Sequence, residues 1–111
     1  MCIFCSIAAG EIPSDKVYED DRVLAFRDIH PQAPTHILVI PKRHMESAAD
    51  VTAENSGDVA RCFEVIAKLI REYGLEDGAR VISNCGPGAG QTVRHLHFHL
   101  LAGKDMGETL V

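Results

Sequence analysis

The spacing of apolar residues predicts one long amphipathic helix and one short helical turn. Between residues 53 and 73, apolar side chains recur at steps of three and four positions, which places them on one face of a helix. Thr52 is the expected N-cap, and Gly74 stands where a left-handed residue ends a helix. Residues 4–9 are predicted to form a single helical turn that ends at Gly10.

Shorter apolar runs predict five strands. A polar turn at Asp20 and Asp21 separates the first two runs, which favours a hairpin, and Pro41 marks the end of the third. Because the strands follow one another closely and one long helix crosses over between them, the order of elements favours an α+β fold with an antiparallel sheet. The predicted strands are residues 16–19, 23–27, 36–40, 80–84 and 95–101.

Length and composition narrow the class of protein. The chain has 111 residues, 46% of them hydrophobic and 24% charged, with no repeat or linker, so we expect one domain over residues 1–111. The formal net charge of −5 argues against a nucleic-acid polymer as the partner. No apolar run approaches the roughly 20 residues that cross a bilayer, and residues 1–5 lack a signal-peptide pattern. We therefore expect a cytoplasmic protein without a membrane partner, whose 4 cysteines are thiols or metal ligands.

Three of the 6 histidines alternate with apolar residues near the end of the chain. If this segment is a strand, His95, His97 and His99 project from one face about 6.7 Å apart, while the residues between them face the core. Three imidazoles on one face could hold a catalytic metal with an open position for water. Alternatively, one imidazole could be a nucleophile that its neighbours orient. The spacing alone leaves both interpretations open.

Three separated segments resemble the motifs of the histidine triad, or HIT, family. Residues 95–101 are similar to the family signature, in which histidines alternate with apolar residues. Residues 26–36 with 39–42, and residues 90–93, resemble the family's other motifs in the same order. Residues 31–36 are most similar to the Hint branch, whose members hydrolyse purine nucleoside phosphoramidates and related adenylates. The resemblance implies a HIT-like antiparallel sheet of about five strands with one long and one short helix. It also implies a homodimer with a continuous sheet.

The resemblance implies a role for each motif residue. His97 is expected to attack the α-phosphorus of an AMP derivative and form a covalent nucleotidyl-histidine, from which water releases AMP. His36 and His99 complete the expected catalytic set, and Asp28 is expected to bind the ribose hydroxyls. The other expected substrate-binding residues are Asn84, Gln91, Thr92 and Val93 around the phosphate, and Ile3, Phe4, Ile7, Phe26 and Ile29 around the purine base. Without the resemblance, these last five residues would be assigned to the core.

Cys2 and Cys5 form a Cys-x-x-Cys pair, for which metal, redox and coincidental interpretations compete. The redox interpretation is weak because no βαβ pattern follows. In zinc-bearing HIT proteins, such a pair is joined by the histidine after the Pro-Lys segment and by the first triad histidine, here His44 and His95. The resemblance therefore implies a closed structural Zn²⁺ site that the chemistry does not require.

The preferred hypothesis is an enzyme that cleaves the P–N bond of purine nucleoside 5′-monophosphate derivatives. A second hypothesis is a dinucleoside polyphosphate hydrolase of the fragile-histidine-triad branch. A third is a zinc-stabilised nucleotide-binding or interaction module. Arg94 departs from the Hint pattern, since relatives often carry an aromatic residue immediately before the triad.

Overall fold

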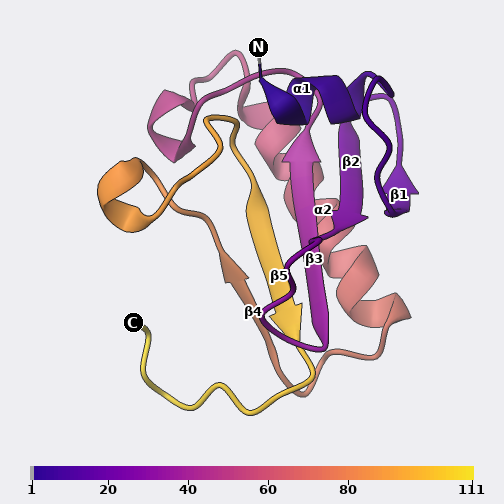
Figure 1. Ribbon diagram of the computed structural model, residues 1–111, viewed down its shortest axis with the longest axis vertical. Coiled ribbons are helices and arrows are strands. Elements are labelled where there is room, and N and C mark those ends of the chain that lie inside the picture. Colours follow the sequence, from indigo (N-terminus) through magenta and orange to yellow (C-terminus); the bar gives the residue numbers. More distant parts are fainter. Residues whose placement is uncertain (1) are drawn as a thin grey trace.

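Residues 2–111, which the computed structural model describes, contain a five-stranded antiparallel sheet (Figure 1). The strand order is β1-β2-β3-β5-β4, and every neighbouring pair is antiparallel. The predicted α+β fold with five strands is therefore confirmed. The strands are β1 (Lys16–Glu19), β2 (Val23–Arg27), β3 (Thr35–Pro41), β4 (Ala79–Ile82) and β5 (Phe98–Ala102).

Two α-helices pack on opposite faces of this sheet. The long helix α2 (Ser56–Glu72) lies behind the sheet in Figure 1, and the short helix α1 (Ile3–Ala8) crosses the upper end of the front face. Two 3-10 turns, η1 (Ala48–Asp50) and η2 (Pro87–Ala89), lie in the connections. Neither helix is long and apolar enough to cross a membrane, nor is any other helix in residues 2–111.

Helix α2 begins later than predicted. Thr52 does not cap it, because its N–H donates to Oδ1 of Asn55 at 2.7 Å and its carbonyl oxygen accepts from the N–H of Ser56 at 2.8 Å. These bonds close a turn before the helix, and Asn55 is the N-cap. At the other end Gly74 has φ +66°, so the predicted left-handed residue is confirmed.

The last strand begins at Phe98 and not at His95. His95 lies in a bend, and the N–H of Leu96 leaves the sheet to donate to the carbonyl oxygen of Met45 at 2.6 Å. The predicted alternation nevertheless holds, because Leu96 and Phe98 are buried in the cluster on the α2 side. Strand β4 is likewise displaced from the predicted range of residues 80–84.

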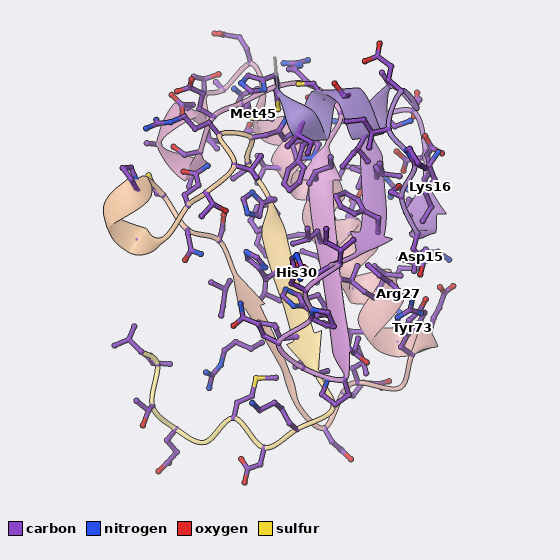
Figure 2. All side chains as sticks on the ribbon, viewed as in Figure 1. Asp15, Lys16, Arg27, His30, Met45 and Tyr73 are labelled. Carbon is purple, nitrogen blue, oxygen red and sulfur yellow. The ribbon has the colours of Figure 1, made fainter. Side chains whose placement is uncertain are left out.

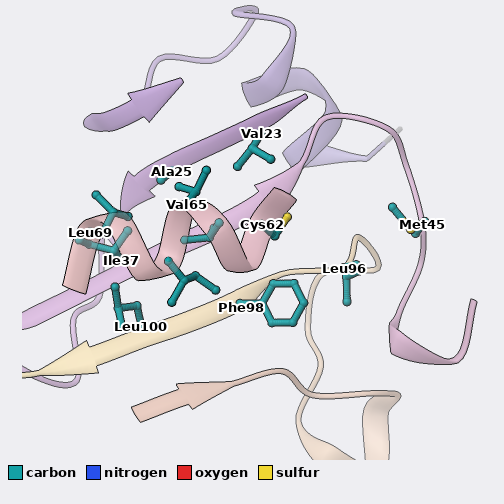
Figure 3. Packing of buried hydrophobic residues seen from close by; sticks show 12 residues of the cluster. Val23, Ala25, Ile37, Met45, Cys62, Val65, Leu69, Leu96, Phe98 and Leu100 are labelled. Atoms are coloured by element: carbon teal, nitrogen blue, oxygen red, sulfur yellow. The ribbon is translucent and has the colours of Figure 1, made fainter. Parts of the chain in front are cut away.

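Each face of the sheet buries an apolar cluster. The larger cluster, shown in Figure 3, fills the space between the sheet and α2 and includes Phe98 and Leu100. The smaller cluster lies under α1 on the opposite face and includes Phe4 and Ile7. Full burial of one such side chain stabilises the fold by about 1.5–3 kcal/mol. Because β5 directs its apolar residues towards α2, its alternate residues face the side of the sheet that α2 leaves open.

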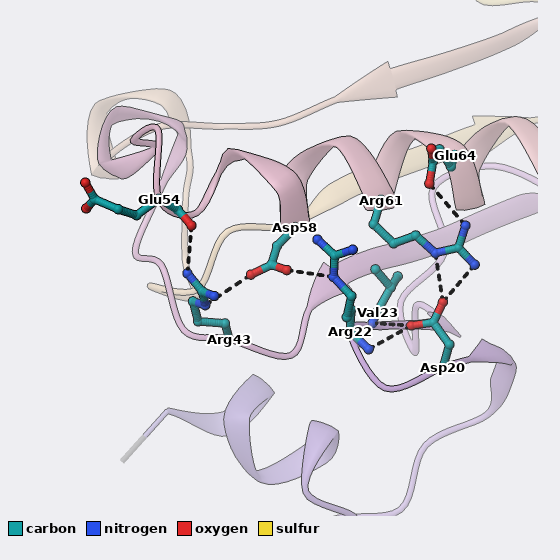
Figure 4. Close-up of polar contacts among 8 residues, drawn as sticks. All are labelled: Asp20, Arg22, Val23, Arg43, Glu54, Asp58, Arg61 and Glu64. Atoms are coloured by element: carbon teal, nitrogen blue, oxygen red, sulfur yellow. Dashed lines mark hydrogen bonds and ion pairs between the residues drawn. The ribbon is translucent and has the colours of Figure 1, made fainter.

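A chain of ion pairs fixes α2 to the segments around the sheet (Figure 4). Asp58 of α2 is 10% exposed, and its two carboxylate oxygens lie 3.0 Å from Nε of Arg22 and 3.1 Å from Nε of Arg43. One turn further along α2, Arg61 pairs with Asp20 at 3.0 Å. The helix is thus attached both to the turn before β2 and to the segment that follows β3.

Candidate active site and metal cluster

His97 is buried just before β5, with one ring nitrogen already occupied. Its Nδ1 lies 2.7 Å from the carbonyl oxygen of His95. A carbonyl oxygen only accepts hydrogen bonds, so Nδ1 carries the proton and Nε2 of the neutral ring keeps its lone pair. The Phe4 ring packs against the imidazole in a T-shaped arrangement, with 5.1 Å between centroids. The ring is therefore held by contacts that leave Nε2 available.

His36 and His99 form a hydrogen-bonded pair beside His97. The N–H of Gln32 donates to Nδ1 of His36 at 3.1 Å, so His36 carries its proton on Nε2. This Nε2 lies 2.9 Å from Nδ1 of His99 and donates to it, which leaves the proton of a neutral His99 on its own Nε2. Burial, followed by the proximity of His97 and His36, lowers the pKa of His99 to about 4. At neutral pH, His99 is therefore an uncharged hydrogen-bond donor.

A cavity of about 330 Å³ opens on this face of the sheet. Its walls bring together most of the polar residues that the sequence motifs singled out. His30 and Gln32 also line it, although sequence analysis gave them no role; His30, labelled in Figure 2, lies in front of the sheet on the segment between β2 and β3. Their position inside the motif at residues 26–36 was the available signal. The predicted residues that line the cavity are Asp28, His36, Asn84, Thr92, His97 and His99.

Asp28 lines the cavity beside His36. Its Oδ1 accepts the backbone N–H of His30 at 2.8 Å, and its Oδ2 lies 3.5 Å from Nε2 of His36. One oxygen therefore shapes the turn after β2, and the other faces the cavity.

The glycine-rich loop is held in place by the side chain of Gln91. Its amide nitrogen donates to the carbonyl oxygens of Glu46 at 2.6 Å and Val93 at 3.0 Å, while its Oε1 accepts the N–H of Gly86 at 2.8 Å. Gly86 and Gly90 both adopt positive φ, which allows the sharp turn. Gln91 thus braces the loop and does not line the cavity, and Val93 packs against the apolar cluster under α1.

The five apolar residues expected around a base divide into two groups. Phe4, Ile7 and Phe26 are buried, and the rings of Phe4 and Phe26 lie 5.6 Å apart in a T-shaped contact. Ile3 and Ile29 are exposed, at 49% and 87%. The buried three are part of the core, and the exposed two are available to a ligand.

Cys2, Cys5, His44 and His95 converge at the end of the sheet where α1 begins. Their ligand atoms all lie within 4.8 Å of one another. Cys2 Sγ and His44 Nδ1 lie 3.3 and 3.2 Å from Nδ1 of His95. Nε2 of His95 lies 2.7 Å from the carbonyl oxygen of Pro41 and donates to it, so its Nδ1 lone pair points into the cluster. Two thiols and two imidazoles with a backbone carbonyl behind one ring fit a tetrahedral zinc site.

The fold and the alternating histidines define a histidine triad protein. A model of the HIT domain matches residues 9–106, and the chain belongs to the HIT family. The family assignment made from the sequence motifs is therefore confirmed.

Relatives match nearly the whole chain. It is 50% identical over 109 residues to the purine nucleoside phosphoramidase of Escherichia coli (strain K12), covering 97% of this chain and 92% of that protein. It is also 50% identical over 109 residues to a 14 kDa zinc-binding protein of Zea mays, covering 94% and 83%. A solved HIT family hydrolase from Clostridium thermocellum has a TM-score of 0.95 and 44% identity, covering 99% of this chain and 96% of that one.

Proposed function

We propose that this HIT family hydrolase cleaves the P–N bond of purine nucleoside 5′-monophosphate derivatives through a covalent intermediate on His97. The class of enzyme is confirmed by the family match and by relatives named as hydrolases and as a phosphoramidase. One observation carries the mechanism: the hydrogen bond from Nδ1 of His97 to the carbonyl oxygen of His95 selects the tautomer in which the lone pair is on Nε2.

The reaction then has two displacements. Nε2 of His97 forms a bond to the α-phosphorus as the bond between phosphorus and the amine breaks, and the amine takes a proton from solvent as it leaves. The ring gains positive charge in this step, which strengthens its hydrogen bond to the carbonyl oxygen of His95. Water then attacks the phosphorus, the bond to His97 breaks, and the nucleoside monophosphate is released.

The remaining cavity residues bind the nucleotide. Neutral His99 donates from Nε2 to a phosphate oxygen, and His36 holds it in that tautomer. Asn84 and Thr92 contact the same phosphate across the cavity. Oδ2 of Asp28, the oxygen nearer His36, accepts a hydrogen bond from a ribose hydroxyl, and Ile29 covers the purine base.

We propose in addition that Cys2, Cys5, His44 and His95 hold Zn²⁺ as a structural ion. The protein would then provide all four ligands of a tetrahedral site, and the ion would cross-link α1 to the sheet. Binding the ion needs both thiols reduced, as they are here, which supports a cytoplasmic location. Strand β4 lies at the sheet edge with Val81 exposed, which supports a homodimer formed by extension of the sheet.

Hydrolysis of a fluorogenic adenosine 5′-phosphoramidate tests the proposal. His97→Asn should lower kcat/KM by about a thousandfold or more, while His30→Asn, which replaces a cavity histidine outside the hydrogen-bonded set, serves as the matched control. Mass spectrometry should detect a nucleotidyl adduct on wild type and not on His97→Asn. Turnover of diadenosine polyphosphates alone would favour the fragile-histidine-triad hypothesis. AMP binding with no turnover of any adenylate would favour a binding module.

A further inference from the structure

Two cations beside the catalytic cavity form no ion pair with a carboxylate of the described residues. Most lysines and arginines of this acidic chain pair with a carboxylate. Within residues 2–111, Arg80 and Lys104 form no such pair. Two cations that line one hollow create a positive local potential, which attracts an anion.

The strand register places Arg80 on the same face of the sheet as the catalytic histidines. Ile82 lies opposite His99 and Arg80 lies opposite Leu101, so Arg80 is one two-residue step, about 6.7 Å, beyond the level of His99. A second hollow of about 270 Å³ lies there between Arg80 and Lys104. It shares Gln32, Ile82 and Leu101 with the catalytic cavity, so the two spaces meet.

Arg80 is oriented before any ligand binds. It is half-buried, and its Nη2 donates to the carbonyl oxygen of Gly107 at 3.1 Å, which leaves its other N–H groups for an anion. Asp105 also lines the hollow, but its Oδ1 accepts the N–H of Gly107 at 2.9 Å and the carboxylate makes no ion pair with either cation. Two of the three residues common to the hollow and the catalytic cavity, Ile82 and Leu101, are apolar.

We infer that this hollow binds the leaving group of the substrate and favours amines that carry a carboxylate, because its two cations adjoin the catalytic cavity. The inference rests on the proposed function, because it assigns a leaving group to the same reaction. Methylene carbons of the amine lie over Ile82 and Leu101, and the carboxylate accepts charge-assisted hydrogen bonds from Arg80 and Lys104. Bond making and breaking at phosphorus are unchanged.

The test compares two isosteric substrates, the AMP phosphoramidates of β-alanine and of β-alaninamide. Wild type should hydrolyse the carboxylate with kcat/KM about tenfold higher than the amide, the scale of one charge-assisted hydrogen bond. In Arg80→Gln and in Lys104→Gln this ratio should fall towards one, and added salt should lower it in wild type. The ratio is independent of the fraction of folded enzyme, so partial unfolding of a variant does not obscure it.

Arg94→Gln is the matched control. Arg94 likewise forms no ion pair in the part of the chain that the structure describes, but it flanks the other side of the cavity, next to Thr92. It should keep the preference of wild type. Equal hydrolysis of the two substrates by wild type would overturn the inference and leave the proposed function standing. A preference that survives in Arg80→Gln and disappears in Arg94→Gln would also overturn it. Hydrolysis of neither substrate would overturn both the inference and the proposed function.

Discussion

The hydroxyl of Ser83 donates a hydrogen bond of 2.8 Å to the carbonyl oxygen of His97. The last paired residues of β4 and β5 in this direction are Ile82 and His99. The side chain of Ser83 therefore joins the two strands by a hydrogen bond one residue beyond the last backbone pair. It does so at the residue whose ring is proposed to attack the substrate.

Loss of this hydrogen bond should affect catalysis more than substrate binding. Ser83→Ala leaves the His97 backbone without this partner, and we expect kcat to fall about five- to tenfold with KM nearly unchanged. The free energy of unfolding should fall by about 1 kcal/mol. Ser83→Thr keeps a hydroxyl and should restore most of kcat. Equal losses of kcat in the alanine and threonine variants would show that the hydrogen bond is not the cause.

The pair formed by His36 and His99 makes stability depend on pH. The pKa of His99 is about 4 in the folded chain, lowered chiefly by burial, against about 6.5 when unfolded. Between these values the unfolded chain binds a proton that the folded chain does not. The contribution of His99 is therefore fully present above pH 6.5 and is lost as pH falls towards 4.

The direction of this pH dependence can be measured by urea unfolding at pH 7.5 and pH 4.5. His99→Asn keeps an acceptor near the position of Nδ1 but cannot titrate, so its stability should fall less than that of wild type over this range. We expect the difference to be on the order of 1 kcal/mol, after allowance for partial exposure. If wild type and His99→Asn lost equal amounts of unfolding free energy between the two pH values, a lowered pKa at His99 would be contradicted. His30→Asn, at an exposed histidine, controls for the removal of an imidazole.

The sequence predicted those features that depend on side-chain periodicity. Alternation placed Leu96 and Phe98 in the core and the histidines on the opposite face, and this holds even though β5 begins only at Phe98. The start of α2 was predicted wrongly because Thr52 and Asn55 both suit an N-cap, and the choice depends on a local turn that periodicity does not encode.

Which particular backbone groups contact the site residues could not be predicted in the same way. The carbonyl oxygens of His95 and Pro41 select the tautomers of His97 and His95, yet every residue type offers a carbonyl. Sequence analysis did not foresee that the side-chain amide of Gln91 satisfies backbone groups of the loop. Such partners become visible only when the chain is folded, because they are distant in sequence or common to all residues.

Metal removal should separate stability from chemistry. Zinc analysis of the purified protein should give about one ion per chain, as expected of a closed four-ligand site, and Cys5→Ser should reduce this, whereas Cys85→Ser, outside the cluster, should not. Chelation should lower Tm by about 4–8 °C for each kcal/mol of stability lost. Phosphoramidate hydrolysis measured well below that Tm should persist. A fully folded, metal-free protein without activity would contradict a purely structural ion.

Gly103 controls how closely the end of β5 approaches the segment that carries Asp28 and His36. Its φ is +96°, and a Cβ there would lie 2.9 Å from Cβ of Pro34. Gly103→Ala therefore destabilises the fold in two ways: the added methyl group clashes with Pro34, and alanine is strained in a left-handed backbone conformation. Gly107 has φ +68° with nothing within 4 Å of its Cβ position, so Gly107→Ala carries the backbone cost alone.

The two alanine variants should thus differ in both stability and substrate binding. Gly107→Ala should lose about 1–2 kcal/mol of unfolding free energy, and Gly103→Ala a further 1–3 kcal/mol or so from overpacking. Because Pro34 lies just before β3, its displacement also moves His36, and KM for the phosphoramidate should rise in Gly103→Ala only. Urea unfolding and steady-state kinetics on the same preparations measure both effects. Equal behaviour of the two variants would mean that Pro34 yields to the added methyl group at no cost.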